Sequence, residues 1–377
     1  MLNRGGQTDV LLLDFSKAFD KVPHHRLSVK LDHYGIRGKT LNWIQSFLSG
    51  REQCVVVNGT KSKWSPVTSG VPQGSVLGPT LFLIYINDIA SDVTSTLRLF
   101  ADDSILYKEI KSTDDQIQLQ NDLQKVFKWA ENWQMSFNAS KCEFLQITRK
   151  TKPLTHTYTV DGQNIAETSK HKYLGVTINK HLDWKDHVQN ITSSARSTLG
   201  VLRRNLSSCP REVKVRAYQA LVRPKLEYSS AAWNPHVTGQ VNSLESVQRQ
   251  AARFATNNYE RTASVTEMLC DLQWDSLATR RIAHQCAMFY KIRQNLVNIP
   301  FPSCVIPSRR LGRTTNSCSY QNIQPRVNTY KYSFFVRVIP VWNLLPTTVV
   351  SANTVQQFQS LALPVLRGLQ LTPSHHL

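Results

Sequence analysis

Three aspartates in the first third of the chain, Asp14, Asp102 and Asp103, have the residue type and spacing to bind divalent cations. Asp14 lies in the apolar run 10–15, which predicts a buried strand. Asp102 and Asp103 lie between the two β-rich arms of residues 97–109, which predict a hairpin. Phosphoryl transfer to a nucleotide needs two cations about 4 Å apart, held by carboxylates from different strands. Taken alone, an Asp-Asp pair at a hairpin tip is more typical of a solvated turn.

The elements that must position these aspartates alternate between strands and helices. Apolar periodicity and turn residues predict strands over 52–57, 142–148 and 172–178, with turns at Asn58-Gly59 and Asp161-Gly162. The same signals predict helices over 26–34, 39–49, 79–90 and from Ser112 to Trp133. From residue 184 the period becomes helical, with helices predicted over 184–204, 211–222, 242–256 and 275–295. Pro, Ser, Asn and Arg dominate residues 298–340, where no element is predicted.

Positive charge is concentrated in the later part of the chain. The net charge is +19, of which residues 1–150 carry +3 and residues 151–377 carry +16. The last 102 residues contain 11 Lys and Arg and no acidic side chain. A surface of one sign attracts a polyanion, so nucleic acid is the expected partner. A basic protein without such a partner is the alternative.

The cysteines and the apolar segments exclude several protein classes. The seven cysteines are scattered and include no C-x-x-C pair, which argues against a zinc module and against a disulfide framework. No apolar run is long enough to span a bilayer, and the first ten residues lack a signal-peptide pattern. We therefore expect an intracellular protein of the nucleus or the cytoplasm with no membrane partner.

Five segments occur in an order that is informative as a set. They read DVLLLDFSKAFDKV (9–22), SGVPQGSVLGP (69–79), FADD (100–103), FNASKCEFL (137–145) and YLGVTIN (173–179). This set resembles the palm motifs of reverse transcriptases, most closely those of non-LTR (LINE-type, jockey-like) retrotransposons. The resemblance covers residues 9–270, and SFFVRVIPVWNLLP (333–346) resembles the C-terminal segment of that lineage more weakly.

The resemblance implies an α+β fold with three regions. A polymerase palm, an antiparallel sheet with packed helices, would span 1–180. A mostly helical thumb would span 181–297, and a basic C-terminal region 298–377. Relatives carry a fingers region before the first motif and often an endonuclease, whereas only eight residues precede Asp9. We therefore expect an N-terminally truncated element whose palm lacks its fingers. In such a chain the three aspartates are present, but part of the apparatus that positions the template and the triphosphate is missing.

The resemblance also assigns the metal and catalytic residues. Asp14 and Asp102 would bind two Mg²⁺ ions, with Mn²⁺ as the alternative, Asp103 would support or bind them, and Phe15 would contribute its backbone carbonyl. Lys141 matches the motif lysine that protonates the departing pyrophosphate, and an ammonium there also stabilises phosphate charge. Without that context, Lys141 would be interpreted as a solvated surface residue.

Further residues would contact the nucleotide and the primer. Phe19 matches an aromatic steric gate against a 2′-hydroxyl, with a core aromatic as the alternative. Gln73, Gly74 and Ala101 would line the nucleotide site, and Pro72 and Gly74 allow close backbone approach. Tyr173, Leu174 and Gly175 match the primer grip, a hairpin that positions the primer 3′ end. The adjacent His24 and His25 cannot share one metal from a helix face and are expected to be structural.

The function that these matches imply is RNA-directed DNA synthesis, with an RNA template, a DNA primer and dNTPs. One alternative is an inactive remnant that only binds nucleic acid through its basic surface. Another is a different palm polymerase, either a group II intron maturase or an RNA-dependent RNA polymerase. Phe19 argues against RNA synthesis, because a ribonucleotide polymerase needs room at that position.

Overall fold

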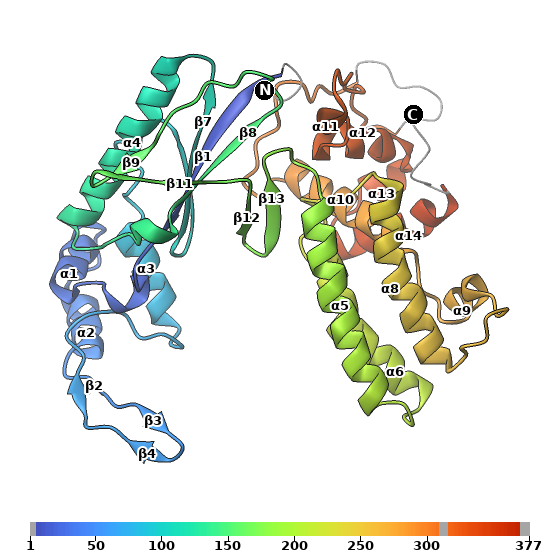
Figure 1. Cartoon of the computed structure of the whole chain (residues 1–377), viewed down its shortest axis with the longest axis horizontal. Helices are drawn as coiled ribbons and strands as arrows, with labels where there is room; N and C mark the ends of the chain where they lie inside the picture. Colours follow the sequence, from blue (N-terminus) through green and yellow to red (C-terminus); the bar gives the residue numbers. More distant parts are fainter. Residues whose placement is uncertain (1–4, 309–315, 370–377) are drawn as a thin grey trace. The chain divides into compact units, whose positions relative to one another are not determined.

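The computed structural model describes residues 5–308 and 316–369 of the chain. The chain divides into two compact units, one of residues Gly5–His171 and one that begins at Lys172 (Figure 1). We call them the first and the second unit.

A five-stranded sheet forms the centre of the first unit, with the strand order β11-β8-β1-β7-β6. Its members are β1 (Gln7–Asp14), β6 (Thr96–Phe100), β7 (Asp103–Ile110), β8 (Glu143–Thr148) and β11 (Ala166–Thr168). All neighbouring pairs are antiparallel except β11 with β8, which is parallel. The expected α+β fold with an antiparallel-rich sheet and packed helices is therefore confirmed, with one parallel pair at the edge.

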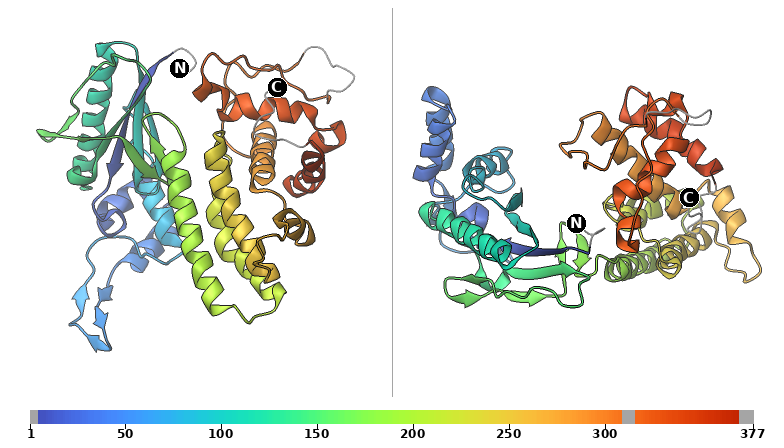
Figure 2. Two further views of the ribbon diagram at one scale, coloured as in Figure 1. Left: turned by 45° about the vertical axis from the view of Figure 1, so that its right-hand side comes forward. Right: turned by 90° about the horizontal axis from the view of Figure 1, so that it is seen from above.

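Four helices contribute to the hydrophobic core of this unit (Figures 1 and 2). They are α1 (His24–His33), α2 (Gly38–Leu48), α3 (Leu77–Ile86) and α4 (Thr113–Asn132). One of them, α4, packs along the sheet against β7. Successive side chains of a strand point to opposite faces, and Leu11, Leu13 and Phe15 all face the helices, each less than 5% exposed. Asp14 lies on the opposite face of β1, where Leu12, which is 6% exposed, is also buried.

Helix α4 begins at the residue that the sequence predicts. The side chains of Ser112 and Asp115 form a capping box, and the Asp115 carboxylate accepts hydrogen bonds from the backbone N–H groups of Lys111 and Ser112. These bonds lower the pKa of Asp115. The cap fixes where the chain leaves β7 and begins to cross the sheet.

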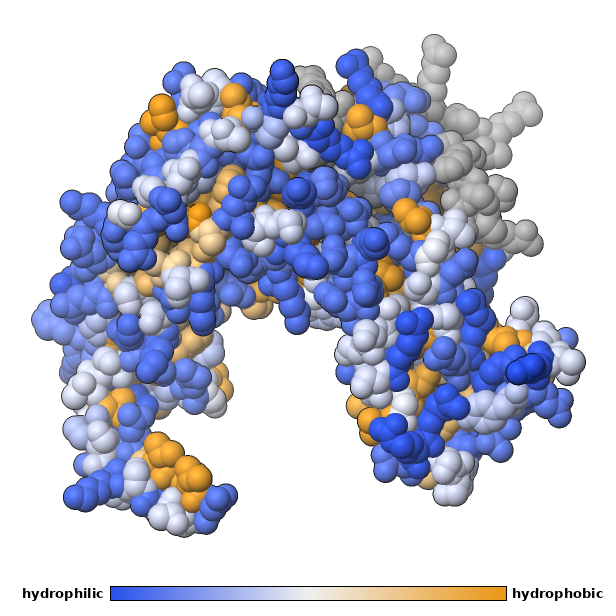
Figure 3. Space-filling model, in the orientation of Figure 1, coloured by the Kyte–Doolittle hydropathy of each residue, from blue (hydrophilic) through white to orange (hydrophobic). Residues whose placement is uncertain are grey.

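The predicted strand over 52–57 is broken at residues 54 and 55. The segment 52–57 forms two short strands, β2 (Glu52–Gln53) and β3 (Val56–Val57), which pair with β5 (Ser65–Pro66) and β4 (Thr60–Lys61). Asn58 and Gly59 both have positive φ, as a two-residue hairpin turn requires, so this turn is confirmed. Apolar side chains, including Val55 and Val57, are exposed on this hairpin (Figure 3).

The prediction of one strand over 172–178 is wrong. The segment forms a hairpin of β12 (Lys170–Tyr173) and β13 (Val176–Asn179). Leu174 and Gly175, with φ of 46° and 83°, make the turn between them. The turn at Asp161-Gly162 is confirmed, and it joins β9 (Thr159–Val160) to β10 (Gln163–Asn164).

The second unit is helical after β13. Its first core is formed by α5 (Lys185–Asn205), α6 (Arg211–Ala217), the π-helix η4 (Tyr218–Val222), α7 (Arg223–Glu227), α8 (Thr238–Thr256), α9 (Val265–Asp271) and α10 (Leu277–Arg293). The four predicted helices of this region are confirmed, whereas the short α9 was not predicted. The segment 211–227 is one continuous helical run with a π turn before Pro224, which has no backbone N–H to donate.

A second, aromatic core gathers α10 with the C-terminal helices α12 (Phe334–Leu344), α13 (Thr347–Val350) and α14 (Val355–Gly368), and the short α11 (Asn328–Lys331) packs against α12. Trp342 and Phe358 are fully buried and stacked, with ring centroids 5.7 Å apart. The sequence predicted no element over 298–340, where the structure has α11 and the start of α12. Among the described residues, every helix is too short or too polar to cross a membrane.

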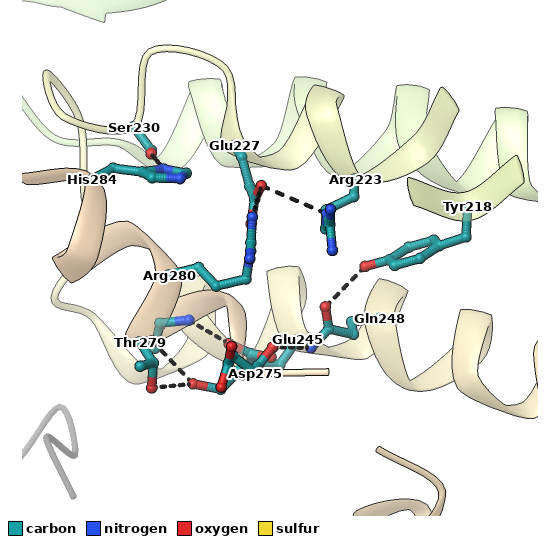
Figure 4. A network of polar contacts seen from close by, with 12 residues as sticks. Tyr218, Arg223, Glu227, Ser230, Glu245, Gln248, Asp275, Thr279, Arg280 and His284 are labelled. Atoms are coloured by element: carbon teal, nitrogen blue, oxygen red, sulfur yellow. Dashed lines mark hydrogen bonds and ion pairs between the residues drawn. The ribbon is translucent and has the colours of Figure 1, made fainter. Parts of the chain in front are cut away.

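A polar network ties the helices of the first core together (Figure 4). The Arg280 guanidinium binds both carboxylate oxygens of Glu227, and one N···O distance is 3.0 Å. The Tyr218 hydroxyl donates to Gln248 at 2.9 Å, and Ser230 bonds His284 at 2.8 Å. Charge-assisted bidentate pairs of this kind fix the relative orientation of the elements that carry them.

His187 on α5 is buried and uncharged. Its Nδ1 accepts a hydrogen bond from the backbone N–H of Thr177 on β13 at 3.2 Å, and its Nε2 has no partner among the described residues. Burial, and secondarily the charge of Lys172, lowers the pKa of His187 to about 4. Because the unfolded chain takes up this proton near pH 6.5, the unfolded state binds more protons than the folded state between these two values.

We therefore expect acidification from about pH 7 to about pH 5 to destabilise the native chain partly through His187. His187→Gln keeps an acceptor for the Thr177 N–H and does not titrate, so its melting temperature should fall less over this range. His181→Gln, which removes an exposed histidine, should keep the native pH dependence. Equal slopes for the native chain and His187→Gln would contradict the assignment.

Candidate active site

The three aspartates lie together where β1 ends and the β6–β7 hairpin turns. Asp14 and Asp103 are direct partners in the antiparallel register of β1 and β7. Directly opposite residues have Cα atoms about 4.5–5.5 Å apart and side chains on the same face. Phe100 pairs with Asp103 to close the hairpin, so Ala101 and Asp102 are its two turn residues. Strand register thus brings together two carboxylates, Asp14 and Asp103, that are 89 residues apart in sequence.

Ala101 has an unusual backbone conformation at this turn. Its φ is 51°, in the left-handed region that non-glycine residues seldom adopt. The turn is nevertheless closed by paired strands on both sides. Strain of this kind persists where the surrounding structure fixes it, and it is concentrated at functional sites.

The carboxylates interact electrostatically. Partial desolvation raises the pKa of Asp103, and the negative charges of Asp102 and then Asp14 raise it further, while His171 lowers it. Like charges held together disfavour ionisation, and a bound cation would relieve that repulsion. The site is therefore one where positive charge is stabilised.

Lys141 is held beside Asp14. It ends the short helix η3 (Ala139–Lys141) before β8, and its ammonium lies 3.4 Å from the Asp14 carboxylate. The backbone N–H of Asn138 donates to the Asp14 carbonyl at 2.7 Å, which fixes this segment to the end of β1. Lys141 is 65% exposed, so its ammonium also faces solvent and is accessible to an anionic ligand.

Aromatic packing holds the backbone just after Asp14. Phe15 is buried, pairs with Phe137 in an isolated bridge and stacks on it with ring centroids 4.0 Å apart. The Ser16 N–H donates to the Ser136 carbonyl at 2.8 Å. The segment that follows Asp14 is therefore held by ring packing at Phe15 and by a backbone hydrogen bond at Ser16.

The loop that contains Pro72, Gln73 and Gly74 is fastened to the segment that follows Asp14. The N–H groups of Gly70 and Val71 donate to the carbonyls of Val22 and Phe19, both at 2.8 Å. The Gln73 side-chain amide donates to the Asp20 carboxylate at 3.1 Å. These contacts give the loop a defined position relative to β1.

Comparison with known proteins identifies the family. The family model described as reverse transcriptase (RNA-dependent DNA polymerase) matches residues 1–178. Residues 1–178 therefore belong to the reverse transcriptase family. The RNA-directed DNA polymerase from mobile element jockey of Drosophila melanogaster is 30% identical over 283 residues, and that of Drosophila funebris is 29% identical over 277 residues. Both alignments cover 69% of this chain and 30% of the relative.

The resemblance to jockey-like reverse transcriptases is therefore confirmed, and the chain spans about a third of the length of these relatives. A solved structure of apo telomerase from Candida tropicalis is also similar, with 10% identity and a TM-score of 0.39, covering 74% of this chain and 45% of that one. Reverse transcriptases generally use divalent metal ions.

The carboxylates of Asp14, Asp102 and Asp103 are of a type that suits a divalent cation, but they do not enclose a single binding position. Carboxylate oxygens are the ligands that Mg²⁺ prefers. Within residues 5–308 and 316–369, however, no three carboxylate, thiol or imidazole side chains converge closely enough to hold one ion together. Asp14, Asp102 and Asp103 are neighbours without forming a closed ligand set, and Asp14 is paired with Lys141. Their roles as metal ligands stay a prediction.

Phe19 lies in the helix η2 (Ala18–Asp20), after Asp14 on the same segment. Its ring is half-buried and stacks on Phe82 of α3 with centroids 4.4 Å apart. The ring therefore contributes to the core and also has an exposed part, so its role as a steric gate stays a prediction. His24 bonds the Gly70 carbonyl through Nε2 at 2.8 Å and so anchors the same loop.

The predicted primer-grip residues belong to the second unit. Tyr173, Leu174 and Gly175 form the end of β12 and its turn. A Cβ on Gly175 would lie 3.0 Å from the Tyr228 ring, so this turn is closely packed within its own unit. Their role stays a prediction too.

Two residues beside the aspartates were not found from the sequence. His171 on β12 bonds Glu143 on β8 through Nδ1 at 2.6 Å, and its charge lowers the pKa of Asp103. The parallel pairing of β11 with β8 aligns Ala166 with Glu143 and leads the chain to His171. Because this pairing is non-local, no motif or spacing in the sequence indicates it.

Gly78 allows the Pro72–Gly74 loop to fold onto the start of α3. A Cβ at this position would lie 2.2 Å from the Pro72 carbonyl oxygen, a backbone atom. Gly78→Ala should therefore displace the loop and lower the free energy of unfolding by about 1–3 kcal/mol, measured by thermal or denaturant unfolding. Gly239→Ala on α8, where a Cβ meets nothing within 4 Å, should be neutral or slightly stabilising. A native-like Gly78→Ala would show that the loop is not fixed as described.

Proposed function

We propose that this chain carries the RNA-directed DNA polymerase activity of a non-LTR retrotransposon. A primer 3′-hydroxyl attacks the α-phosphate of a dNTP opposite an RNA template, and pyrophosphate leaves. The observation that carries the proposal is the juxtaposition of Asp14, at the end of β1, with Asp102 and Asp103, at the start of β7, on a chain whose residues 1–178 match the reverse transcriptase family. We propose that the first unit acts as the palm, the start of the second as the thumb, and residues 298–377 as a basic C-terminal region. We also propose that the chain acts inside the cell, where the template and dNTPs occur.

Each residue of the site has a task that its surroundings support. Asp14, Asp102 and Asp103 would hold two Mg²⁺ ions, with the Phe15 carbonyl as a further oxygen donor. Bound there, the ions would neutralise phosphate charge and activate the primer hydroxyl. The like-charge repulsion that raises the pKa of Asp103 supports this assignment, because cations relieve it.

The remaining residues position the substrate. Lys141, held 3.4 Å from Asp14 and largely exposed, would stabilise the departing pyrophosphate and donate a proton to it. Gln73, Gly74 and Ala101 would line the nucleotide, and the fastening of the Gln73 loop to Asp20 supports a fixed contact surface. Tyr173, Leu174 and Gly175 would hold the primer end. Positioning of this kind contributes much of the rate in phosphoryl transfer.

The assay is extension of a DNA primer annealed to an RNA template, with dNTPs and Mg²⁺. Asp102→Asn should reduce extension by roughly 100-fold or more, because it removes a charge at the reacting phosphates. Asp92→Asn removes an exposed carboxylate elsewhere in the first unit and should match the native chain. No extension by the native chain, or equal extension by Asp102→Asn, would refute the proposal.

The sugar selectivity tests Phe19 separately. Phe19→Ala removes the ring that would lie under the sugar, so incorporation of rNTPs relative to dNTPs should rise by about tenfold or more. Because the ring also packs on Phe82, the melting temperature is measured alongside, and Phe19→Tyr, which keeps the ring, should retain dNTP selectivity. An unchanged ratio in a folded, active Phe19→Ala chain would assign Phe19 to the core alone.

A further inference from the structure

Two arginines converge on one asparagine inside the second unit. Arg281 on α10 is fully buried, and its Nε donates a hydrogen bond to the side-chain oxygen of Asn234 at 3.1 Å. Arg337 on α12 is partly buried, and its Nη1 donates to the backbone carbonyl of Asn234 at 2.7 Å. The Asn234 amide nitrogen in turn donates to Gln285 at 3.0 Å, which fixes the amide with its oxygen toward Arg281. We call Arg281, Arg337 and Asn234 together the Asn234 site.

Arg281 has a buried nitrogen that no described residue satisfies. Its Nη1 is inaccessible to solvent and has no hydrogen-bond partner within the described part of the chain. Buried polar atoms are nearly always hydrogen-bonded, so an atom of this kind indicates an acceptor such as a water molecule or an ion. Burial lowers the pKa of Arg281 and that of Arg337 to about 10, which leaves both guanidiniums charged at neutral pH. The acceptor would therefore lie beside two positive charges.

The two carboxylates that act electrostatically on Arg281 are engaged by other groups. Glu227 binds the guanidinium of Arg280 through both carboxylate oxygens (Figure 4). Glu245 accepts a hydrogen bond from a backbone N–H group in the first turn of α10 at 2.9 Å. Both carboxylates counteract the fall in the pKa of Arg281, but neither forms an ion pair with it. The chain therefore pairs one of two adjacent arginines of α10 and leaves the charge of the other without a counter-charge in contact.

The charge of Arg337 is not balanced by the side chains of its own part of the chain. Residues 276–377 contain no acidic side chain, and α10, α12, α13 and α14 all lie within this segment. Arg337 forms no ion pair among the described residues, and the nearby charge of Arg281 adds to the effect of burial on its pKa. Charges held in the interior without a partner cost stability unless an ion compensates them.

We propose that the Asn234 site binds one small inorganic anion, chloride. The ion accepts a hydrogen bond from Arg281 Nη1 and lies beside the guanidinium of Arg337. The complete burial of Arg281 excludes a large anion or a polymer strand, because the ligand must be enclosed by the protein. A water molecule would satisfy the same N–H group and would leave both charges uncompensated. The site lies where the two cores of the second unit meet, since Trp233 belongs to the first core and α12 to the second, so the bound ion stabilises their contact.

The test compares the melting temperature of the full chain in sodium chloride and in sodium gluconate at the same ionic strength. Gluconate is too large for an enclosed site, so replacing it by chloride at about 150 mM should raise the melting temperature by about 2–4 °C. Bromide should have the same effect as chloride. In crystals soaked with bromide, anomalous scattering should place a bromide ion beside Arg281 Nη1.

Two variants remove the anion site in different ways. Asn234→Asp places a carboxylate between the two guanidiniums, so this chain should fold and lose most of the difference in melting temperature between chloride and gluconate. Arg281→Met removes the charge that holds the anion and should lose the same difference. Arg261→Gln removes an exposed arginine from the same unit and should keep the full difference.

The proposal is overturned if the native chain melts at the same temperature in both salts, which would assign the acceptor to water. It is also overturned by a full chloride effect in Asn234→Asp, or by native crystals that bind no bromide beside Arg281. Asn234→Asp and the bromide experiment keep the test decisive where Arg281→Met does not fold. Because stability is measured and primer extension is not, the result is independent of the polymerase proposal.

Discussion

A slip of one residue in the pairing of β1 with β7 would turn the aspartates of the site to opposite faces of the sheet. The observed register aligns Asp14 with Asp103 and, at the same time, places Leu11 and Leu13 against the helices. Because strand side chains alternate between the two faces, the register that buries Leu11 and Leu13 also places Asp14 on the opposite face. The apolar core therefore fixes the carboxylates more firmly than any contact between the carboxylates themselves, which repel one another.

That repulsion explains the composition of the surroundings. Lys141 lies beside Asp14, and His171 counteracts the rise in the pKa of Asp103 while it is held by Glu143. These cationic groups come from η3 and β12, which follow the aspartates in the chain and reach them only once β8 has paired with β1. Partial compensation of this kind reduces the repulsion between the carboxylates in the folded chain.

Local signals account for the elements that the sequence predicted well. The apolar run of β1, the capping box at Ser112 and the Asn58-Gly59 turn each depend on a few adjacent residues. The errors have non-local causes. Leu174 adopts a left-handed conformation that its residue type does not indicate, and α12 forms around Pro340 because its apolar side chains fill the aromatic core. The His171–Glu143 pair depends on a parallel strand at the sheet edge.

The buried Lys30 and the crowded pair of Asp102 and Asp103 are subject to the same physical constraint. Burying or crowding unpaired charges costs stability, and mutations that remove such a cost are common unless a ligand makes use of the charge. The chain buries Lys30, which is 3% exposed, and pairs its ammonium with the Asp88 carboxylate and the Tyr85 carbonyl. It also crowds Asp102 and Asp103 at a strained turn although one carboxylate would avoid the repulsion. Crowding of these carboxylates lowers the stability of the free protein, and a ligand of opposite charge that bound there would raise it.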